Sequence, residues 1–233
     1  MRLIKHIDFT KETSLDSSIW NVEIGEKWSN RELQQYTDDS ENLYFDNGLV
    51  ICATYNQGVY KSARINTKGK LCFLYGRIEI KAKVPSGKGT WPALWMMSNT
   101  TPYGHWPKSG EIDIMEHVGN QKDWLYSCLH TEKYNHKVDD YYYAKNYYSN
   151  LTDTFHTYTL VWTKEHIEYY FDKQKVVTYT RGITKRDSSP AGWPFDHPFY
   201  LIMNLAVGGT LGGKVIKEDF PQRFVIQSIK IWQ

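Results

Sequence analysis

The sequence predicts an all-β fold, a sandwich or barrel built from short antiparallel strands. From Arg77 to Val84, charged and apolar residues alternate strictly, which is typical of a strand with one buried face. Similar β-rich runs recur along the chain, and no window of about eleven residues or more keeps the apolar stripe of a helix. We therefore expect about ten or more strands and only a turn or two of helix.

The expected strands are runs rich in β-branched and aromatic residues, separated by turns rich in Gly, Pro, Asn and Asp. Two longer connections, 135–154 and 181–198, carry tyrosines and Trp193, and we expect them to form aromatic rims beside a sheet. No repeat, low-complexity tract or linker divides the chain, so residues 1–233 are expected to form one domain. Besides residues 77–84, the strands are Leu49–Tyr55, Gly89–Met97, Glu111–Val118, Leu125–His130, His156–Thr163, His166–Phe171, Lys175–Thr180, Tyr200–Val207 and Arg223–Trp232.

The composition excludes several classes of function. With 28 Lys+Arg against 26 Asp+Glu, the chain lacks the basic field that drives nucleic-acid binding, so no nucleic-acid partner is expected. The longest apolar stretch, Leu201–Val207, is too short for a bilayer and contains Asn204, so no membrane partner is expected either. Aromatic residues make up 15% of the chain, more than one core of this size usually demands. These amphipathic rings are the first pointer to function.

The cysteines and the N-terminus bear on the compartment. Cys52, Cys72 and Cys128 show no CxxC spacing, so we expect buried reduced thiols or at most one bridge. The first nine residues include Arg2, Lys5 and Asp8 and thus lack the apolar core of a secretory leader. The protein is accordingly expected either to be intracellular or to have a leader that is missing from this sequence.

The most informative segment is an acidic strand that begins at Glu111. Three carboxylates, Glu111, Asp113 and Glu116, fall within six residues of a run otherwise made of β-formers. Glu111 and Asp113 share one face of a strand, whereas the odd offset of Glu116 would place it on the buried face. One bulged residue at Ile114 or Met115 would return Glu116 to the acidic face. We therefore expect a β-bulge between Asp113 and Glu116.

Two such glutamates suit double displacement at an anomeric carbon. With the bulge, Glu111 and Glu116 are about four strand steps apart, roughly 13 Å. Side chains that lean inward can bring the carboxyl groups to the roughly 5 Å of a retaining glycosidase. One carboxylate would attack the sugar while the other, kept protonated, would donate to the leaving oxygen and later activate water. Asp113 lies between them and can order the nucleophile.

The same residues allow two alternatives to a sugar site. The first alternative is a metal site made of the carboxylates and His117. It is disfavoured because hard-cation sites normally use loop oxygens, and because the bulge puts His117 on the apolar face. A solvated acidic strip is the other alternative. It is disfavoured because Trp106 and the tryptophans of residues 89–95 flank the acids, and indole faces stack on the C–H faces of pyranose rings. No metal is assigned to these residues.

The segment from Gly110 to Glu116 resembles the Glu-x-Asp-x-x-Glu signature of glycoside hydrolase family 16, in its laminarinase-like branch. The resemblance implies a β-jelly-roll sandwich of two antiparallel sheets, concanavalin A-like, with a concave substrate cleft. The extra residue Met115, relative to the Glu-x-Asp-x-Glu of lichenases, looks like the bulged, β-1,3-glucan-cleaving type. The similarity extends through Ser62–Thr67, Tyr75–Glu79, Gly89–Trp95, Trp106–Pro107 and Asn204–Gly209.

The resemblance also implies roles for single residues. By position in the motif, Glu111 is the nucleophile, Asp113 its assistant and Glu116 the acid/base. It further implies that Trp106 stacks on a sugar in a glycone subsite, and that Arg64 and His130 hydrogen-bond sugar hydroxyls.

For some of the expected substrate-binding residues, a purely structural role is the alternative. Trp91 precedes Pro92 and is expected to reach the cleft, whereas Trp95, between two apolar residues, is equally well a core residue. Asn204, within an apolar run, needs a buried partner in either case. His130 has the alternative of being an ordinary histidine at a strand end.

The expected function is a retaining endo-β-glucanase that hydrolyses β-1,3-glucan of the laminarin type or mixed-linkage β-1,3/1,4-glucan. The alternatives are a family 16 galactanase, similar to agarases and porphyranases, and a non-catalytic, lectin-like glucan-binding module. The partner is a β-glucan polysaccharide or oligosaccharide, and we expect a monomer. Polymeric glucan cannot enter a cell intact, so an extracellular or cell-surface location is expected.

No cofactor is expected to be required. Many members of the family that this chain resembles hold a structural calcium with an aspartate in the last strand. Here the corresponding stretch is Gln227–Trp232, which offers an amide in that place. Loss of the carboxylate removes most of the attraction for a hard cation, which argues against a structural calcium.

Overall fold

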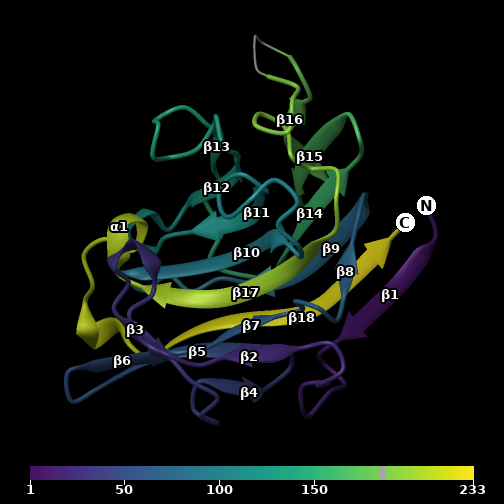
Figure 1. The fold of residues 1–233 in the computed structure, drawn as a ribbon. Coiled ribbons are helices and arrows are strands. Elements are labelled where there is room, and N and C mark those ends of the chain that lie inside the picture. Colours follow the sequence, from purple (N-terminus) through teal and green to yellow (C-terminus); the bar gives the residue numbers. More distant parts are fainter. Residues whose placement is uncertain (184–186) are drawn as a thin grey trace.

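The computed structural model describes residues 1–183 and 187–233, so part of the expected connection 181–198 lies outside the described residues. Two sheets are stacked as curved layers (Figure 1). The described helices are short: α1 (Gly209–Gly212) and the 3-10 turns η1 (Ser29–Arg31), η2 (Gly119–Gln121) and η3 (Lys217–Asp219). None of the described helices has the length and apolar run needed to cross a membrane. The expected all-β sandwich is confirmed.

The first sheet has the order β16-β15-β14-β9-β18-β5-β6-β3, with β1 beside β18 and β4 beside β5. Its neighbouring strands are antiparallel except for the parallel pair β3 and β6. Its strands are β1 (Leu3–Asp8), β3 (Gln34–Tyr36), β4 (Leu43–Phe45), β5 (Leu49–Asn56), β6 (Val59–Ser62), β9 (Gly76–Lys83), β14 (His156–Trp162), β15 (His166–Phe171), β16 (Gln174–Thr180) and β18 (Gln222–Trp232).

The second sheet carries the acidic strand near its centre, in the order β13-β12-β11-β10-β17-β7-β2, with β8 beside β17. Its strands are β2 (Asn21–Glu23), β7 (Arg64–Asn66), β8 (Cys72–Phe73), β10 (Thr90–Ser98), β11 (Glu111–His117), β12 (Trp124–His130), β13 (Tyr142–Tyr147) and β17 (Phe199–Val207).

Alternation decides which side chains fill the space between the sheets. On β9, Ile78 and Ile80 are fully buried while Lys81 is exposed, as the sequence pattern predicts. On β10, Leu94 and Met96 enter the same core from the other sheet. Each such side chain stabilises the sandwich by about 1.5–3 kcal/mol. The residues between them on β10 consequently point away from the core.

The expected bulge is present on β11. Asp113 pairs with Cys128 and Glu116 with Tyr126, so Ile114 and Met115 together oppose one residue of β12. Both side chains belong to the core and are at most 2% exposed. Because two successive residues turn inward, Glu116 returns to the outer face that Glu111 and Asp113 share.

Three expectations need correction. The connection 135–154 is not all loop, because β13 lies within it and pairs with β12. Trp193 is not on a rim: it is 1% exposed and packs edge-on against Phe195 in the core. Several strands of the first 75 residues were not expected either, because most of them have only two to four residues and the longer β1 buries little besides Ile7.

Candidate active site

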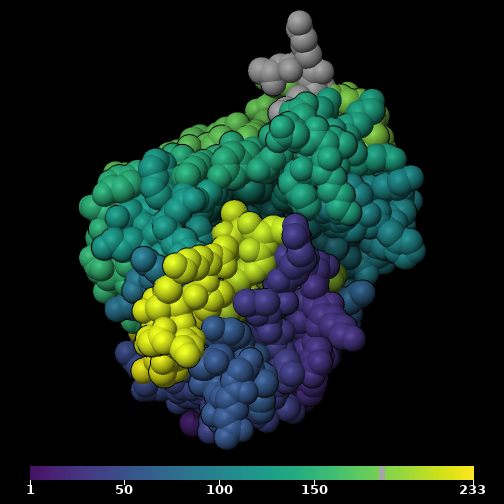
Figure 2. Space-filling model, turned by 90° about the vertical axis from the view of Figure 1, so that its left-hand side faces the viewer, coloured from purple at the N-terminus to yellow at the C-terminus, as the bar shows by residue number. Residues whose placement is uncertain are grey.

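A cavity of about 430 Å³ opens on the outer, concave face of the second sheet. Figure 2 shows it as a hollow between the teal surface from the middle of the chain and the purple and yellow surfaces near η1 and α1. Eight of the nine predicted site residues line it: Glu111, Asp113, Glu116, Trp106, Trp91, Arg64, Trp95 and Asn204. The structure therefore brings these eight residues together around one cavity.

Strand β10 supplies two tryptophans to the cavity floor. Trp91 and Trp95 are cofacial and lie on the face opposite the core residues of this strand, so Trp95 faces the cavity and is not a core residue. The Trp91 indole N–H donates to Glu116 Oε1 at 3.0 Å. The Trp95 indole N–H donates to Asn204 Oδ1 at 2.7 Å. Trp91 thus fixes a carboxylate, whereas Trp95 fixes a neutral amide.

The buried amide of Asn204 has the partner that its position in an apolar run requires. Its Nδ2 donates to the Tyr36 hydroxyl at 2.9 Å, while Oδ1 accepts from Trp95. Arg64 lies beside it on β7, forms an ion pair with Glu23 and places its guanidinium 4.9 Å from the centroid of the Trp95 ring. These polar groups of the wall are therefore held in fixed orientations.

Glu111 begins β11 directly after a glycine that few other residues could replace. Gly110 has φ +82°, and a Cβ there would lie 3.0 Å from atoms of Pro194 and Phe195. The Trp106 indole N–H donates to Glu111 Oε2. The structure thus gives Trp106 a direct contact with the carboxylate, and its ring also forms part of the cavity wall.

Asp113 lies between the two glutamates and is only 3% exposed. Burial raises the pKa of Asp113 well above its usual range, and the nearby charges of Glu111 and Glu116 and a hydrogen bond with Glu111 act in the same direction. A protonated Asp113 can donate this hydrogen bond to the Glu111 carboxylate. The centre then avoids three adjacent negative charges.

Glu116 is in surroundings that favour its acid form. Burial is the largest cause that raises the pKa of Glu116, and the charge of Glu111 adds to it. His130 and the hydrogen bond from Trp91 oppose the shift without cancelling it. The arrangement therefore provides a carboxylic acid that keeps its proton to a higher pH than a glutamate usually does.

Two histidines near the acidic strand do not line the cavity. His130 does not line the cavity: its Nε2 lies 3.3 Å from Asp113 Oδ2, and its ring stacks on Tyr141. The expected contact of His130 with sugar hydroxyls is therefore replaced by a contact with Asp113. His117 is fully buried on the core side, donates to the Lys122 carbonyl at 3.0 Å and has its pKa lowered by burial to about 4. It does not join the carboxylates.

The sequence reasoning missed part of the cavity wall. Trp28 and Glu32 come from the segment around η1, which has no alternation that would predict its position. His136 and Lys137 come from the connection between β12 and β13, and the Lys137 ammonium lies 4.7 Å from the centroid of the Trp106 ring. The position of Lys137 just before the tyrosine-rich run 141–148 is the sequence feature that could have indicated this part of the wall.

At the position of the calcium ligand in the last strand, the chain offers an unsuitable group. The Gln227 backbone carbonyl accepts from the Phe9 N–H at 2.9 Å, and the Gln227 side-chain Nε2–H donates to the Asn47 carbonyl at 3.4 Å. An amide N–H turned toward a carbonyl cannot act as a ligand to a hard cation. These groups do not fit a calcium ion.

The sequence of the chain as a whole agrees with what the site suggests. The profile described as glycosyl hydrolases family 16 matches residues 14–220. The chain belongs to glycosyl hydrolase family 16. As a family 16 protein it is a glycoside hydrolase, and its three carboxylates lie in the cavity of that enzyme.

Relatives of this family 16 chain act on several β-linked polysaccharides. It is 38% identical over 229 residues to a beta-glucanase of Rhodothermus marinus, with 94% of this chain and 80% of the relative covered. It is 32% identical over 242 residues to a keratan-sulfate endo-1,4-beta-galactosidase of Sphingobacterium multivorum, with 99% and 55% covered. The crystal structure of a laminarinase from Flavobacterium sp. UMI-01 superposes with a TM-score of 0.93 at 37% identity, with 100% of both chains covered.

Proposed function

We propose that the protein is a retaining endo-β-glucanase that cleaves β-1,3-glucan of the laminarin type or mixed-linkage β-1,3/1,4-glucan. The observation that carries the proposal is the contrast between two glutamates on one cavity floor. Glu116 is half-buried and has a raised pKa, whereas Glu111 accepts a hydrogen bond from Trp106 and can accept one from Asp113. Such a pair supplies one acid and one nucleophile.

The reaction proceeds in two steps on this geometry. A Glu111 oxygen attacks the anomeric carbon as the bond to the leaving oxygen breaks, and Glu116 transfers its proton to that oxygen. Glu116, now a carboxylate, then removes a proton from water, and the water oxygen displaces Glu111 from the anomeric carbon. Trp91 stabilises the ionised form of Glu116 between the steps. The configuration of the product is the same as that of the substrate.

Trp91→Phe is expected to move the alkaline limb of the kcat/KM profile to higher pH. The Trp91 N–H lowers the pKa of Glu116, so its removal raises that pKa and keeps the acid protonated at higher pH. Rates on laminarin oligosaccharides between about pH 4 and pH 9 measure the shift. Trp95→Phe is the matched control, because its indole bonds an amide, and it should leave the limb in place. A limb that moves to lower pH in Trp91→Phe contradicts the assignment of Glu116.

The sheet also supports binding on both sides of the carboxylates. Trp95, Asp113, Cys128 and Tyr143 are paired in register on four neighbouring strands, β10 to β13. Tyr143 therefore lies on the same face as the acids but beyond them, opposite the tryptophans. It is 43% exposed, and its ring contacts Tyr126 and Tyr141. A glucan that crosses the strands would meet aromatic rings on each side of the cleaved bond, as endo action requires.

Tyr143→Ala is expected to raise KM for long laminarin oligosaccharides by about threefold to tenfold, with little change in kcat. A lost ring contact of about 0.5–1.5 kcal/mol accounts for this range. Initial rates on oligosaccharides of increasing length measure it, because the effect should vanish for substrates too short to reach β13. Tyr170→Ala on β15 of the other sheet is the control. An equal effect of Tyr143→Ala on all lengths would contradict a binding role on this side.

Linkage preference and stereochemistry are tested together. Products from laminarin, barley mixed-linkage glucan and agarose are compared side by side, and the anomer released first is followed by nuclear magnetic resonance. We expect β-products from the two glucans and slow or absent cleavage of agarose. Early α-products would overturn the retaining mechanism, and preferred cleavage of agarose would overturn the glucan assignment.

A galactan substrate is the second candidate, and similarity to the Sphingobacterium multivorum keratan-sulfate endo-1,4-beta-galactosidase favours it. The lysine near Trp106 would suit a sulfated galactan, because an ammonium can pair with a sulfate group. A lectin-like module without activity has less support, since neighbouring carboxyl groups with raised pKa values are typical of catalytic sites and serve no purpose in binding alone. We further propose an extracellular or cell-surface location, because polymeric glucan does not enter a cell intact.

A further inference from the structure

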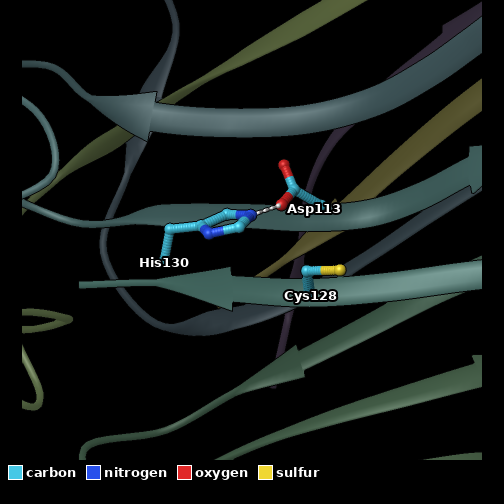
Figure 3. A group of neighbouring side chains, drawn as sticks. All are labelled: Asp113, Cys128 and His130. Atoms are coloured by element: carbon cyan, nitrogen blue, oxygen red, sulfur yellow. Dashed lines mark ion pairs between the residues drawn. The ribbon is translucent and has the colours of Figure 1, made fainter. Parts of the chain in front are cut away.

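A buried cluster of three different metal-ligating side chains lies at the edge of the carboxylate site. Asp113 comes from β11, and Cys128 and His130 come from β12, and one ligand atom of each lies within 4.8 Å of the others. Figure 3 shows Asp113 and His130 facing each other, with Cys128 beside them. All three side chains are buried, and Asp113 reaches the cavity surface. The proposed reaction uses neither the thiol nor the imidazole directly.

The cluster has unused ligand capacity. Asp113 Oδ2 has no hydrogen-bond partner in the described part of the chain, although the residue is only 3% exposed. The atom facing it, His130 Nε2, lies at 3.3 Å, beyond a good charge-assisted hydrogen bond. Cys128 Sγ lies 3.9 Å from Glu116 Oε2, so a fourth donor is adjacent. A buried polar atom without a partner is costly and is a common feature of a site that binds a ligand.

We propose that a zinc-class divalent ion binds to Asp113, Cys128 and His130 and blocks the enzyme. Tetrahedral zinc, with bonds of about 2.0–2.3 Å, holds its ligand atoms roughly 3.3–3.8 Å apart, so the Asp113–His130 pair already has the required spacing. The sulfur has to approach by about 1 Å, which a small change of its side-chain torsion supplies. Glu116 or water completes the coordination shell.

The donor set determines which ions bind. Thiolate and imidazole prefer zinc and cadmium, whereas magnesium and calcium prefer oxygen ligands. The acidic groups of the cavity floor can lose their protons to any divalent cation, but only an ion that prefers sulfur ligands gains from Cys128. The bound ion blocks the reaction because it withdraws Asp113 from Glu111, and because Glu116, adjacent to Cys128, is no longer free to reach the leaving oxygen once it joins the coordination shell.

The binding test uses the full-length protein and needs no enzymatic activity. Titration with zinc, followed by calorimetry, is expected to give one site per chain. Titration with cobalt is expected to give the near-ultraviolet charge-transfer band of a thiolate ligand and the visible bands of a tetrahedral ion. In Cys128→Ser the band should disappear and zinc affinity should fall at least tenfold. Cys72→Ser, which changes a thiol in β8 outside the cluster, should retain both signals.

The cobalt spectrum of the unmodified protein keeps the proposal testable if Cys128→Ser does not fold. Absence of a thiolate band there, or unchanged zinc affinity in a folded Cys128→Ser protein, would overturn the proposed site.

The inhibition test rests on the proposed function, and the binding test does not. Zinc is expected to reduce laminarin hydrolysis, whereas equal concentrations of magnesium and calcium should not. The half-inhibitory zinc concentration, relative to the metal-free rate of each variant, should rise at least tenfold in Cys128→Ser and remain unchanged in Cys72→Ser. Equal inhibition of both variants would overturn the proposal. A protein that binds zinc as described but hydrolyses no glucan would refute the proposed function alone.

Discussion

Glu111→Gln is expected to lower kcat on laminarin by roughly four orders of magnitude or more, because an amide cannot displace the leaving sugar. The fold and glucan binding should persist. The amide oxygen can still accept the Trp106 N–H, and the change is close to isosteric. Reducing-sugar release gives the rate, calorimetry with laminarin oligosaccharides gives Kd, and thermal unfolding gives stability.

Azide distinguishes the loss of a nucleophile from any other cause. In Glu111→Gly, the cavity left by the side chain admits azide, which attacks the same face of the sugar and is expected to give an α-glycosyl azide from an activated substrate. If Glu111→Gln cleaves laminarin within about tenfold of the rate of the unmodified protein, Glu111 is not the nucleophile. A β-azide from Glu111→Gly would exchange the roles of the two glutamates.

Glu116→Ala is the second large effect, expected at about 10²- to 10⁴-fold in kcat on laminarin. The loss should be much smaller for an aryl glycoside whose phenolate leaves without a proton, because only water activation still needs the missing base. Azide should then replace water and give a β-glycosyl azide. Rates on laminarin and on the aryl substrate, with and without azide, measure these effects.

Glu32→Gln is the matched control for Glu116→Ala. Glu32 is another carboxyl of the cavity wall whose pKa burial raises, but it bonds the Gln34 side chain and lies apart from the acidic strand. Its loss should affect both substrates alike and should show no azide rescue. If Glu116→Ala slows the two substrates equally, Glu116 does not act as the acid.

The orientation of the acidic strand could be predicted from sequence because two local features, alternation and an odd spacing of acids, determine it. Alternation assigns faces, and the odd offset between Glu111 and Glu116 allows both to reach one face only through a bulge. Trp91 and Trp95 follow by the same period-two rule, since the apolar residues between them must face the core. These positions depend on neighbours along the chain, and the sequence contains that information.

Positions that depend on tertiary structure could not be predicted in this way. Trp28 reaches the cavity because an irregular segment crosses the edge of the sheet, and no periodic pattern records such a path. The family resemblance implies that His130 touches sugar, but Asp113 lies between it and the cavity. Tyrosines 142 and 143 lie next to each other, yet only the register of β13 decides which one is core and which is exposed.

The bulge on β11 determines which register of the strand places Glu116 on the cavity floor. A slip by one residue would exchange Glu116 for an apolar neighbour on the cavity floor and bury a carboxylate instead. What opposes the slip is the packing of Ile114 and Met115, which contributes about 1.5–3 kcal/mol for each side chain. Each 1.4 kcal/mol changes the ratio of the two registers about tenfold. Two side chains on the core side of the strand therefore stabilise the register in which all three carboxyl groups reach the cavity floor.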